Sequence, residues 1–308
     1  MANTSRDALL IFNPRAGRAG TLLSSGGLDR VRTILARQGV ESEVAHTDTP
    51  EAAEEAARTS VRQNRDMVVA CGGDGTLNAV VNGLVGSQVP MALLPAGTAN
   101  ILAKELNLPR NLERAAAYVA GGTPRRIALG MLTTYNGQAR SRYFLSVGGA
   151  GPDGAIVQAV DNHLKENAGM LAFWVEGFRQ FASYSFPRFR VISEGGELEA
   201  TMIVAGRTKH YGGPFRITTQ ADLYGNDFEV MTCATRSSFR YASYLPLALV
   251  GQVRLASGTK FFKTASFRCE PIDDPPAALE VDGEPAGHLP AEFRVVPDAL
   301  TLLTPKAP

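Results

Sequence analysis

The chain has 308 residues, a length that predicts about two domains because a single hydrophobic core stops growing well before this size. Hydrophobic residues make up 44% and charged residues 20%, which are ordinary globular values and exclude disorder for most of the chain. The 31 Lys and Arg residues against 30 Asp and Glu residues leave a formal net charge of +1, so a nucleic-acid partner is not expected.

The start of the chain does not have the pattern of a targeting signal. Residues 1–7 are polar, and the apolar run 8–12 is too short for the core of a signal peptide. The longest apolar stretches, around 245–250, fall far short of the about 20 residues that a spanning helix needs. Three widely separated cysteines without a CxxC motif predict reduced thiols: Cys71, Cys233 and Cys269. We therefore expect a cytoplasmic protein, with any membrane contact peripheral and on the inner face of the membrane.

Strands and helices are expected to alternate over residues 1–125. The continuous apolar runs predict buried parallel strands, at 8–12, 67–71 and 91–94. Apolar residues at helical spacing and helix-start signals predict helices around 28–35, from Thr49 onward, at 77–84 and at 99–106. This alternation is typical of an α/β domain, in which a parallel sheet has helices on both faces.

Short strands dominate from residue 126 onward, separated by turns rich in Gly and Pro. Such a pattern predicts a mainly-β sandwich over residues 126–297. Two helices are expected to interrupt it, at 168–184 and 237–250. The expected strands are 126–130, 143–147, 188–193, 201–205, 227–233, 260–269, 279–282 and 293–296.

The sharpest signal in the sequence is Gly72-Gly73-Asp74-Gly75-Thr76-Leu77-Asn78, which lies between a predicted strand and a predicted helix. Glycines let the backbone approach a ligand closely, and the start of the following helix offers unpaired N–H groups. We expect this loop to hold phosphate groups, with Asp74 binding Mg²⁺ against the phosphate oxygens. The alternative is a tight strand-to-helix turn that binds nothing.

Two further loops follow predicted strands in the same way. These are Asn13-Pro14-Arg15-Ala16-Gly17-Arg18-Ala19-Gly20 and Pro95-Ala96-Gly97-Thr98-Ala99-Asn100. Because the carboxyl ends of parallel strands meet at one edge of a sheet, the three loops should converge there. Arg15 and Arg18 could then pair with phosphate, and the Thr98 hydroxyl could donate to it. Each loop alone is as well explained as an ordinary connection, and neither GxxxxGK[ST] nor GxGxxG spacing occurs at these positions.

Together these motifs resemble the diacylglycerol kinase catalytic-domain family, in its soluble bacterial lipid-kinase branch. The similarity continues through Gly148-Gly149-Ala150-Gly151-Pro152-Asp153 and ends at Val281-Asp282-Gly283-Glu284-Pro285. Because Gly-Gly-Asp-Gly also occurs in NAD kinases and phosphofructokinases, the C-terminal Asp-Gly-Glu is the discriminating element. The resemblance implies an ATP-binding domain at 1–125, a β-sandwich lipid-substrate domain at 126–297 and a cleft between them. It also implies that the last strand, at about 298–308, can return to the first domain.

The resemblance assigns functional roles to particular residues. Glu284 would be the general base, since a carboxylate that accepts the proton of a lipid hydroxyl lowers the barrier. Asp74 would be the second catalytic residue and the Mg²⁺ ligand. The expected ATP contacts are Asn13, Pro14, Arg15, Ala16, Gly17, Thr47, Gly72, Gly73, Asp74, Gly75, Thr76, Leu77, Asn78 and Thr98. Without the resemblance, Glu284 would more simply be a solvated acid on a turn.

The chain departs from the family at one metal site. Many members carry a Leu-Asp-Asp-Gly turn that holds a structural Mg²⁺ in the second domain, whereas the corresponding stretch here is Leu223-Tyr224-Gly225-Asn226-Asp227. Because the paired acids are missing, we expect no dedicated metal there. The four histidines, His46, His163, His210 and His288, have no recognisable ligand spacing and are expected to be non-catalytic.

Aromatic and Arg residues are mixed over residues 173–190, from Phe173 and Trp174 to Phe189 and Arg190. Such a mixture could form a membrane or lipid-entry surface. The helical spacing of the aromatic residues favours core packing instead.

We therefore expect an ATP- and Mg²⁺-dependent kinase that phosphorylates the hydroxyl of a lipid such as diacylglycerol. Its partner would be a lipid in a peripherally contacted membrane, and a homodimer is compatible with the sequence. The alternatives are a sphingoid-base or phosphatidylglycerol kinase, a soluble-substrate kinase of the NAD kinase type, and a non-catalytic nucleotide sensor. The presence of both Asp74 and Glu284 weighs against the sensor.

Overall fold

The computed structural model describes residues 5–17, 26–135, 137–159 and 184–305. The chain divides into two units: unit 1 comprises Met1–Leu129 and Pro297–Pro308, and unit 2 comprises Gly130–Val296. The boundaries predicted from the sequence, after residues 125 and 297, lie near these junctions. Two strands contribute residues to both units: β5 (Thr123–Thr134) and β18 (Ala291–Thr304).

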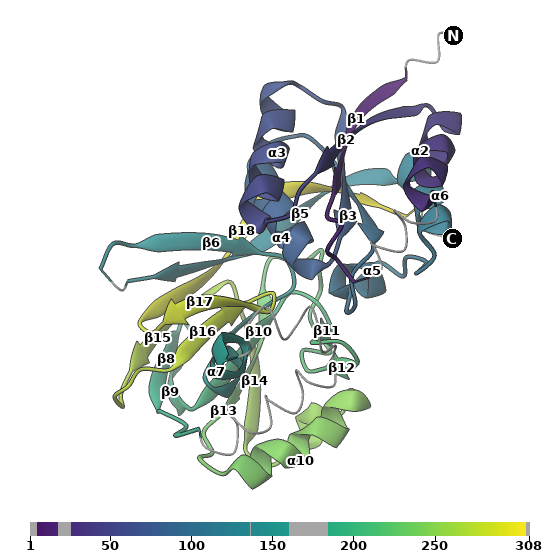
Figure 1. The fold of residues 1–308 in the computed structure, drawn as a ribbon. Helices are drawn as coiled ribbons and strands as arrows, with labels where there is room; N and C mark the ends of the chain where they lie inside the picture. The colour runs from purple at the N-terminus through teal and green to yellow at the C-terminus, as the bar shows by residue number, and fades with distance from the viewer. Residues whose placement is uncertain (1–4, 18–25, 136, 160–183, 306–308) are drawn as a thin grey trace. The chain divides into compact units, whose positions relative to one another are not determined.

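Unit 1 alternates strands and helices, as predicted (Figure 1). Besides parts of β5 and β18, its elements are β1 (Arg6–Phe12), α2 (Gly27–Arg37), β2 (Val40–His46), α3 (Pro50–Arg62), β3 (Met67–Gly72), α4 (Asp74–Leu84), β4 (Met91–Pro95), α5 (Ile101–Glu105) and α6 (Leu112–Gly121). The strands lie in the order β2-β1-β3-β4-β18 and are parallel throughout. The α/β fold class predicted for this part of the chain is confirmed.

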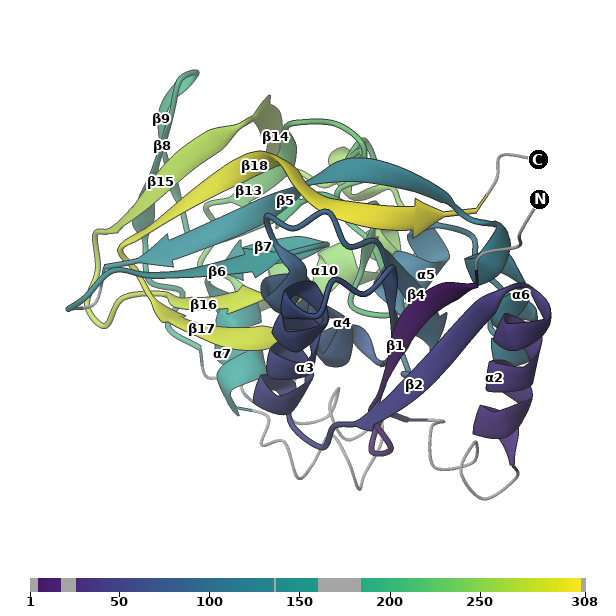
Figure 2. The same cartoon turned by 90° about the horizontal axis from the view of Figure 1, so that it is seen from above.

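Helices cover both faces of this sheet. Helices α3 and α4 pack together on one face, and α2 and α6 pack together on the other (Figures 1 and 2). A Cβ atom on Gly83 of α4 would lie 2.4 Å from the carbonyl oxygen of Glu54, so only glycine allows α3 and α4 to approach so closely. Arg30 of α2 and Glu113 of α6 form an ion pair at 2.7 Å across the other face.

Strand β2 was not predicted from the sequence. It forms the edge of the sheet, pairing only with β1 among the described strands. Its sequence, VESEVAH, places polar residues at most positions, because an edge strand with one partner is only partly buried. The rule that identified the other strands, a continuous apolar run, therefore does not apply to it.

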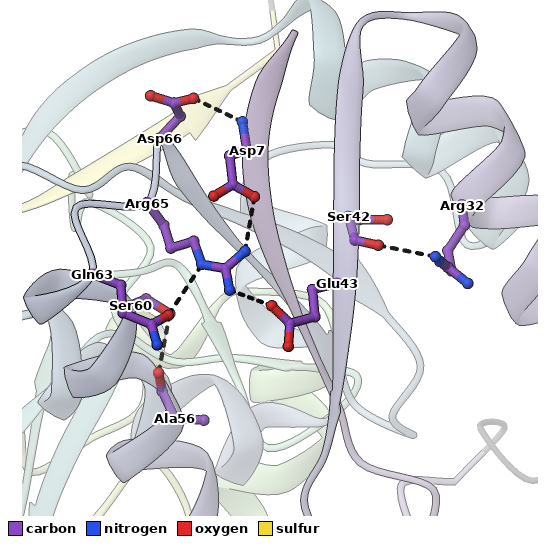
Figure 3. A network of polar contacts seen from close by, with 9 residues as sticks. All are labelled: Asp7, Arg32, Ser42, Glu43, Ala56, Ser60, Gln63, Arg65 and Asp66. Carbon is purple, nitrogen blue, oxygen red and sulfur yellow. Dashed lines mark hydrogen bonds and ion pairs between the residues drawn. The ribbon is translucent and has the colours of Figure 1, made fainter.

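A polar network holds the amino-terminal side of this sheet together (Figure 3). The guanidinium of Arg65 donates to Asp7 of β1 at 2.8 Å and to Gln63 at 3.2 Å, and it pairs with Glu43 of β2. The Asp66 carboxylate accepts the Asp7 N–H at 2.7 Å. Because Asp7 lies near the start of β1 and Asp66 directly before β3, this network leaves the carboxyl ends of both strands free for the site.

Unit 2 is mainly β, as predicted. Besides parts of β5 and β18, its elements are β6 (Arg140–Phe144), β7 (Val147–Ala150), α7 (Pro152–Ala159), β8 (Phe189–Ser193), β9 (Gly196–Ala200), β10 (Met202–Gly206), β11 (His210–Tyr211), β12 (Phe215–Arg216), β13 (Phe228–Cys233), α10 (Ser238–Leu249), η1 (Val253–Leu255), β14 (Thr259–Thr264), β15 (Ser266–Pro271), β16 (Ala278–Val281) and β17 (Glu284–His288). Six strands form an antiparallel sheet in the order β14-β13-β10-β7-β16-β17, and β15 joins β18 and β8 in the opposing sheet.

Four buried phenylalanines fill the core between these sheets. The rings of Phe267 and Phe293 stack at 4.7 Å, and those of Phe144 and Phe228 stack at 5.8 Å. Offset stacking of this kind adds to the stabilisation that burial of the rings already gives. The β-sandwich class predicted for the second part of the chain is confirmed.

Three predicted elements differ from the structure or lie outside it. The predicted strand 143–147 is wrong as a single strand, because β6 ends at Phe144 and β7 begins at Val147 in the other sheet. The predicted strand 260–269 is wrong as a single strand, because β14 and β15 belong to different sheets and separate at residue 265. The Thr264 hydroxyl donates to the Ser266 carbonyl at 2.8 Å and accepts from the Ser266 N–H, a local bonding pattern that favours a corner over a continued strand. The predicted helix 168–184 lies outside the described residues, apart from Tyr184.

Candidate functional site

The candidate site in unit 1 is built from loops at the carboxyl ends of its parallel strands. The chain leaves β1 for β2 on one side of the sheet and leaves β3 for β4 on the other. The sheet order therefore reverses between β1 and β3, and in open α/β sheets ligands bind outside the carboxyl ends of strands at such a point.

Three glycine-containing loops touch one another there. A Cβ atom on Gly97 would lie 2.4 Å from the Cα of Gly73, so these two backbones are in direct contact. The N–H groups of Ala96 and Gly97 both donate to the Gly72 carbonyl, at 3.0 and 3.1 Å. On the other side, a Cβ on Gly17 would lie 3.2 Å from the Thr98 hydroxyl oxygen. The structure thus brings the three predicted loops together, and any larger side chain at Gly97 would push them apart.

Asn13 fixes the first loop against the second. Its side-chain amide donates to the Thr76 hydroxyl at 3.1 Å, and its Oδ1 accepts the Arg15 N–H at 2.9 Å. Thr76 is itself buried, and a Cβ on Gly72 would lie 2.5 Å from the Thr76 Cβ. Asn13, Gly72 and Thr76 therefore set the shape of the site in addition to any contact with a ligand.

The Asp74 carboxylate joins the second loop to the third. Its Oδ2 accepts the N–H of Asn100 at 2.9 Å, and its Oδ1 accepts the N–H of Ile101 at 2.7 Å. Burial raises the pKa of this carboxyl, while the two backbone N–H groups and the charge of Lys104 act in the opposite direction. Each carboxylate oxygen still has a second lone pair, so the arrangement leaves Asp74 able to bind a cation.

Sequence analysis did not assign the roles of two residues in this site: Asn100, the last residue of the third loop, and Lys104. The side chain of Asn100 bonds Gly97 in both directions, its Oδ1 accepting the Gly97 N–H at 3.0 Å and its Nδ2 donating to the Gly97 carbonyl at 2.7 Å. Its φ of 50° is left-handed, which Asn tolerates, and this preference was the available signal. Lys104 lies close enough that its charge acts on Asp74, and burial lowers the pKa of its ammonium group. No spacing in the sequence links Lys104 to Asp74.

The remaining predicted ATP contacts differ in exposure. Thr47, directly after β2, is buried, and its N–H donates to the Phe12 carbonyl at 2.9 Å. The side chains of Leu77 and Asn78 are buried in α4, so only their backbone could face a ligand. Arg15, Gly17 and Thr98 are exposed, Pro14, Ala16, Gly73 and Gly75 are half-buried, and Arg18 lies outside the described residues.

Glu284, the predicted general base, lies in unit 2 at the start of β17. The two residues before it, Asp282 and Gly283, have φ values of 49° and 79° and connect β16 to β17 as a tight hairpin turn. The Asp282 carboxylate fixes this turn by accepting three backbone N–H groups, from Leu145, Ser146 and Val147, at 2.8, 2.8 and 3.0 Å. Glu284 is half-buried, and within the described part of the chain its carboxylate has no hydrogen-bond partner.

A buried pair of carboxyl groups lies beneath this turn. Glu280 Oε2 accepts the Gly283 N–H at 2.8 Å, while Glu280 Oε1 and Asp153 Oδ2 both face Gly149, within 3.0 Å of the position that a Cβ would occupy. Burial, and then the charge of Asp153, raise the pKa of Glu280 well above its ordinary value. Burial also raises the pKa of Asp153, which bonds the buried Tyr211 hydroxyl. The charge of one carboxylate disfavours ionisation of the other.

The stretch Leu223–Asp227 surrounds a buried cation of the protein itself. Arg207 is fully buried and donates from Nη1 to the Asp227 carbonyl at 2.8 Å and from Nη2 to the Leu223 carbonyl at 2.9 Å. Burial lowers the pKa of its guanidinium to about 10. The carbonyl groups of this turn therefore accept hydrogen bonds from a guanidinium. That no metal binds here stays a prediction.

The aromatic segment 173–190 lies mainly outside the described residues. Of its described members, Phe186 and Phe189 are buried, so for these two the membrane interpretation is wrong and the core interpretation holds. Phe186 stacks on Tyr241 at 5.0 Å. Among the described residues, no helix combines the length and the apolar character that crossing a membrane requires.

Known proteins resemble this chain along nearly its whole length. Residues 7–132 match the family model of the diacylglycerol kinase catalytic domain, and residues 146–304 match that of the YegS C-terminal NAD kinase beta sandwich-like domain. The chain is 27% identical to a diacylglycerol kinase of Staphylococcus saprophyticus over 303 residues, which are 97% of this chain and 95% of the relative. It is 28% identical to a diacylglycerol kinase of Bacillus subtilis over 292 residues, 93% of this chain and 92% of the relative. A crystal structure of a diacylglycerol kinase from Bacillus anthracis has the same fold, with a TM-score of 0.76, 20% identity and 98% coverage of both chains.

Proposed function

Since the chain belongs to the family that joins a diacylglycerol kinase catalytic domain to a YegS C-terminal NAD kinase beta sandwich-like domain, and is by that membership a kinase, we propose that it is an ATP- and Mg²⁺-dependent lipid kinase. The proposed reaction transfers the γ-phosphoryl group of ATP to the hydroxyl of a lipid such as diacylglycerol. The supporting observation in the structure is the backbone contact of three glycine-containing loops at the point where the sheet order reverses.

The residues of this site fit Mg·ATP. The contact between Gly73 and Gly97 leaves no space for a Cβ and brings the third loop against the start of α4. The N–H groups in the first turn of α4 are therefore the proposed donors to phosphate oxygens. Magnesium commonly takes only one or two protein carboxylates together with phosphate oxygens and waters, and Asp74 supplies one. Lys104 adds a cation beside it. The proposed phosphate-binding residues are Gly73, Thr98 and Lys104, with Asp74 as the metal ligand.

The chemistry divides between the two units. When bound, Mg·ATP supplies the transferable phosphoryl group and neutralises charge on its oxygens. The first-turn N–H groups of α4 would orient the phosphates, and the Asn13 and Asn100 side chains would hold the loops in place. Glu284 would accept the proton of the acceptor hydroxyl on a carboxylate oxygen, because an alcohol is a poor nucleophile at neutral pH. The Asp282 turn would fix where that carboxylate lies.

The experiment that tests this function uses ATP labelled at its γ-phosphate. The purified chain would be incubated with Mg²⁺ and a mixed lipid extract, and in parallel with NAD as a soluble acceptor. The proposal expects label in a lipid product that requires Mg²⁺. Label in NADP would support the soluble-substrate alternative, which the description of the second domain as NAD kinase-like motivates. Nucleotide binding without transfer to any acceptor would support the sensor. Identification of the labelled lipid would decide among diacylglycerol, phosphatidylglycerol and sphingoid bases.

A further inference from the structure

Helix α10 has two faces of different character. Its inner face packs on the six-stranded sheet of unit 2, where Ala248 shares a hydrophobic cluster with Val204 and Met231. The residues at 241, 244 and 248 are buried, whereas 239, 246 and 250 are exposed. At 3.6 residues per turn, positions i, i+4, i+7 and i+11 form one stripe on the side opposite the buried residues. The exposed stripe consists of Phe239, Ser243, Pro246 and Val250, and all of these except Ser243 are apolar.

Other large apolar residues are exposed in the same segment of the chain. Phe239 is 87% exposed and Val250 59%, and nearby Leu249 and Leu255 are 49% and 74% exposed. The four lie on α10, at its C-terminal end and on η1, which packs against α10. Single exposed apolar residues are common on soluble proteins, but a group of large ones within one short segment marks a surface that contacts something. We define the α10 patch as Phe239, Pro246, Leu249, Val250 and Leu255.

The segment that carries the α10 patch contains basic residues and no acidic ones. From residue 234 to residue 263 the sequence contains five Arg and Lys residues and no Asp or Glu: Arg236, Arg240, Arg254, Lys260 and Lys263. Three of them are paired with acids elsewhere: Arg254 with the buried Glu229, Lys263 with Asp227 at 3.8 Å, and Arg236 with Asp273 at 3.9 Å.

The positive charge that remains lies on two residues. Arg240 and Lys260 have no ion-pair partner among the described residues, and both are exposed. The Arg240 guanidinium lies beside Gly258, two residues before Lys260, since a Cβ on Gly258 would be 3.6 Å from Arg240 Nη1. Basic residues next to an apolar stripe are the pattern of helices that lie in the interface of a membrane containing anionic lipids.

We propose that the α10 patch is the surface through which unit 2 binds the face of a bilayer that contains anionic lipids. Phe239, Leu255 and their neighbours enter the boundary between headgroups and acyl chains, and Arg240 and Lys260 bind the headgroups. A second copy of this chain would offer the same positive charge and would be repelled, which favours an anionic bilayer as the occupant. The inference rests on the proposed function, because a lipid kinase has to reach an acceptor that is held in a membrane.

The test measures binding without catalysis. The full chain, without nucleotide, would be sedimented with vesicles of phosphatidylcholine and with vesicles of phosphatidylcholine and phosphatidylglycerol. We expect binding to the anionic vesicles to weaken about tenfold or more in the double variant Phe239→Ser/Leu255→Ser. In Arg240→Gln/Lys260→Gln we expect loss of the preference for anionic vesicles. Ile272→Ser is the matched control, because Ile272 is an exposed apolar residue of unit 2 outside the patch. Wild-type binding by both double variants would overturn the proposal.

Two further measurements separate the proposal from its rivals. Thermal unfolding should give nearly the same midpoint for all variants, because only exposed side chains are changed. Sedimentation velocity would detect the competing outcome, in which the patch variants dissociate a dimer while vesicle binding persists; that result would overturn the proposal.

The kinase assay is run with a short-chain diacylglycerol dissolved as monomers and with the same acceptor in vesicles. The proposal predicts that the patch variants lose activity only on vesicles. If the wild-type chain phosphorylates neither acceptor but binds anionic vesicles through the patch, the proposed function fails and the docking surface stands.

Discussion

The Oδ1 atom of Asp74 accepts a hydrogen bond of 2.7 Å from the backbone N–H of Ile101, which lies 27 residues further along the chain. With the second bond, from the Asn100 N–H, this carboxylate holds the start of α5 beside the Gly72–Gly75 loop. Asp74 therefore has a structural function in addition to the metal-binding function that we propose for it.

Asp74→Ala should abolish Mg²⁺-dependent turnover and also lower stability. Each backbone N–H left without an acceptor costs about 1–3 kcal/mol when it stays buried. Asp74→Asn keeps the size but has only one carbonyl oxygen, so it should satisfy one of the two donors and still fail to turn over. A turnover assay with γ-labelled ATP and a measurement of thermal unfolding test the two effects. Asp29→Asn, which changes an exposed carboxylate of α2, is the control. A folded Asp74→Asn protein with wild-type turnover would rule out the assignment.

Gly97→Ala should separate the loops, because its Cβ would lie 2.4 Å from the Gly73 Cα. We expect a loss of stability of about 1–3 kcal/mol from overpacking. ATP affinity should fall about tenfold or more, because the displaced loops no longer align with the phosphate groups. A tenfold fall corresponds to a loss of ~1.4 kcal/mol in the free energy of binding.

Gly83→Ala provides a matched control for this effect. Its Cβ would meet the Glu54 carbonyl at the same distance of 2.4 Å, but between α3 and α4. It should reduce stability and leave the ATP affinity of the folded protein unchanged. Equal ATP affinity in the Gly97→Ala and Gly83→Ala proteins would show that the contact between Gly73 and Gly97 does not shape the nucleotide site.

The sequence predicts the loops of this site well, because each follows a strand that is a continuous apolar run. It predicts the strand ends and the glycines, and parallel pairing then brings the loops to one edge. The bonds between the loops cannot be predicted in this way. The spacing in the sequence does not indicate that Asp74 accepts the Asn100 N–H or that the charge of Lys104 acts on Asp74. Those contacts depend on the register of β3 against β4.

The same limit applies in unit 2. Asp153 belongs to the motif at 148–153, and Glu280 directly precedes the motif at 281–285. Their pairing could not be predicted, because it depends on β16 lying beside β7. Edge strand β2 and the corner at Thr264 were not predicted because of their own residues. Both contain polar residues that form neither a continuous apolar run nor a regular alternation of apolar and polar residues, the two patterns that mark a buried strand.

Arg207→Met should destabilise unit 2, because it leaves the carbonyl oxygens of Leu223 and Asp227 without their donor. The expected loss is about 1–3 kcal/mol for each carbonyl that stays buried. Arg216→Met, which removes an exposed guanidinium, should have a much smaller effect. Urea denaturation measures both.

Chelation provides a second check on this turn. If the Arg207 guanidinium alone stabilises the turn at Leu223–Asp227 and no metal is bound there, EDTA should leave the unfolding midpoint of the nucleotide-free protein unchanged. A fall in that midpoint, or Mg²⁺ or Ca²⁺ found bound at Leu223–Asp227, would contradict the prediction.

The Glu280 carboxyl should make stability fall as the pH rises. Its pKa is raised in the folded protein, so above the ordinary Glu pKa the folded state binds more protons than the unfolded chain does. The stability that this group contributes is therefore complete below the ordinary Glu pKa and decreases as the pH rises above it. The raised pKa of Asp153 acts with the same sign.

In the Glu280→Gln variant the side chain at position 280 cannot ionise, but it keeps an oxygen that can accept the Gly283 N–H. The free energy of unfolding should therefore decrease less between about pH 5 and pH 8 in this variant than in the wild-type protein. Glu194→Gln, at an exposed turn position, should keep the wild-type slope. Urea titrations at both pH values give the comparison, and identical slopes for all three proteins would show that the buried pair does not hold a proton.

The central claim, that this chain is a kinase whose acceptor is deprotonated by Glu284, is tested most directly by Glu284→Gln. Nucleotide affinity by calorimetry and turnover on the preferred lipid would be measured for both proteins. The account predicts a fall in kcat of roughly 10²–10⁴, the usual contribution of a positioned base, with ATP affinity unchanged because Glu284 belongs to unit 2. Unchanged turnover would reduce Glu284 to a solvated acid on a turn, and lost ATP binding would make it a nucleotide ligand or a structural residue; either result would contradict the account.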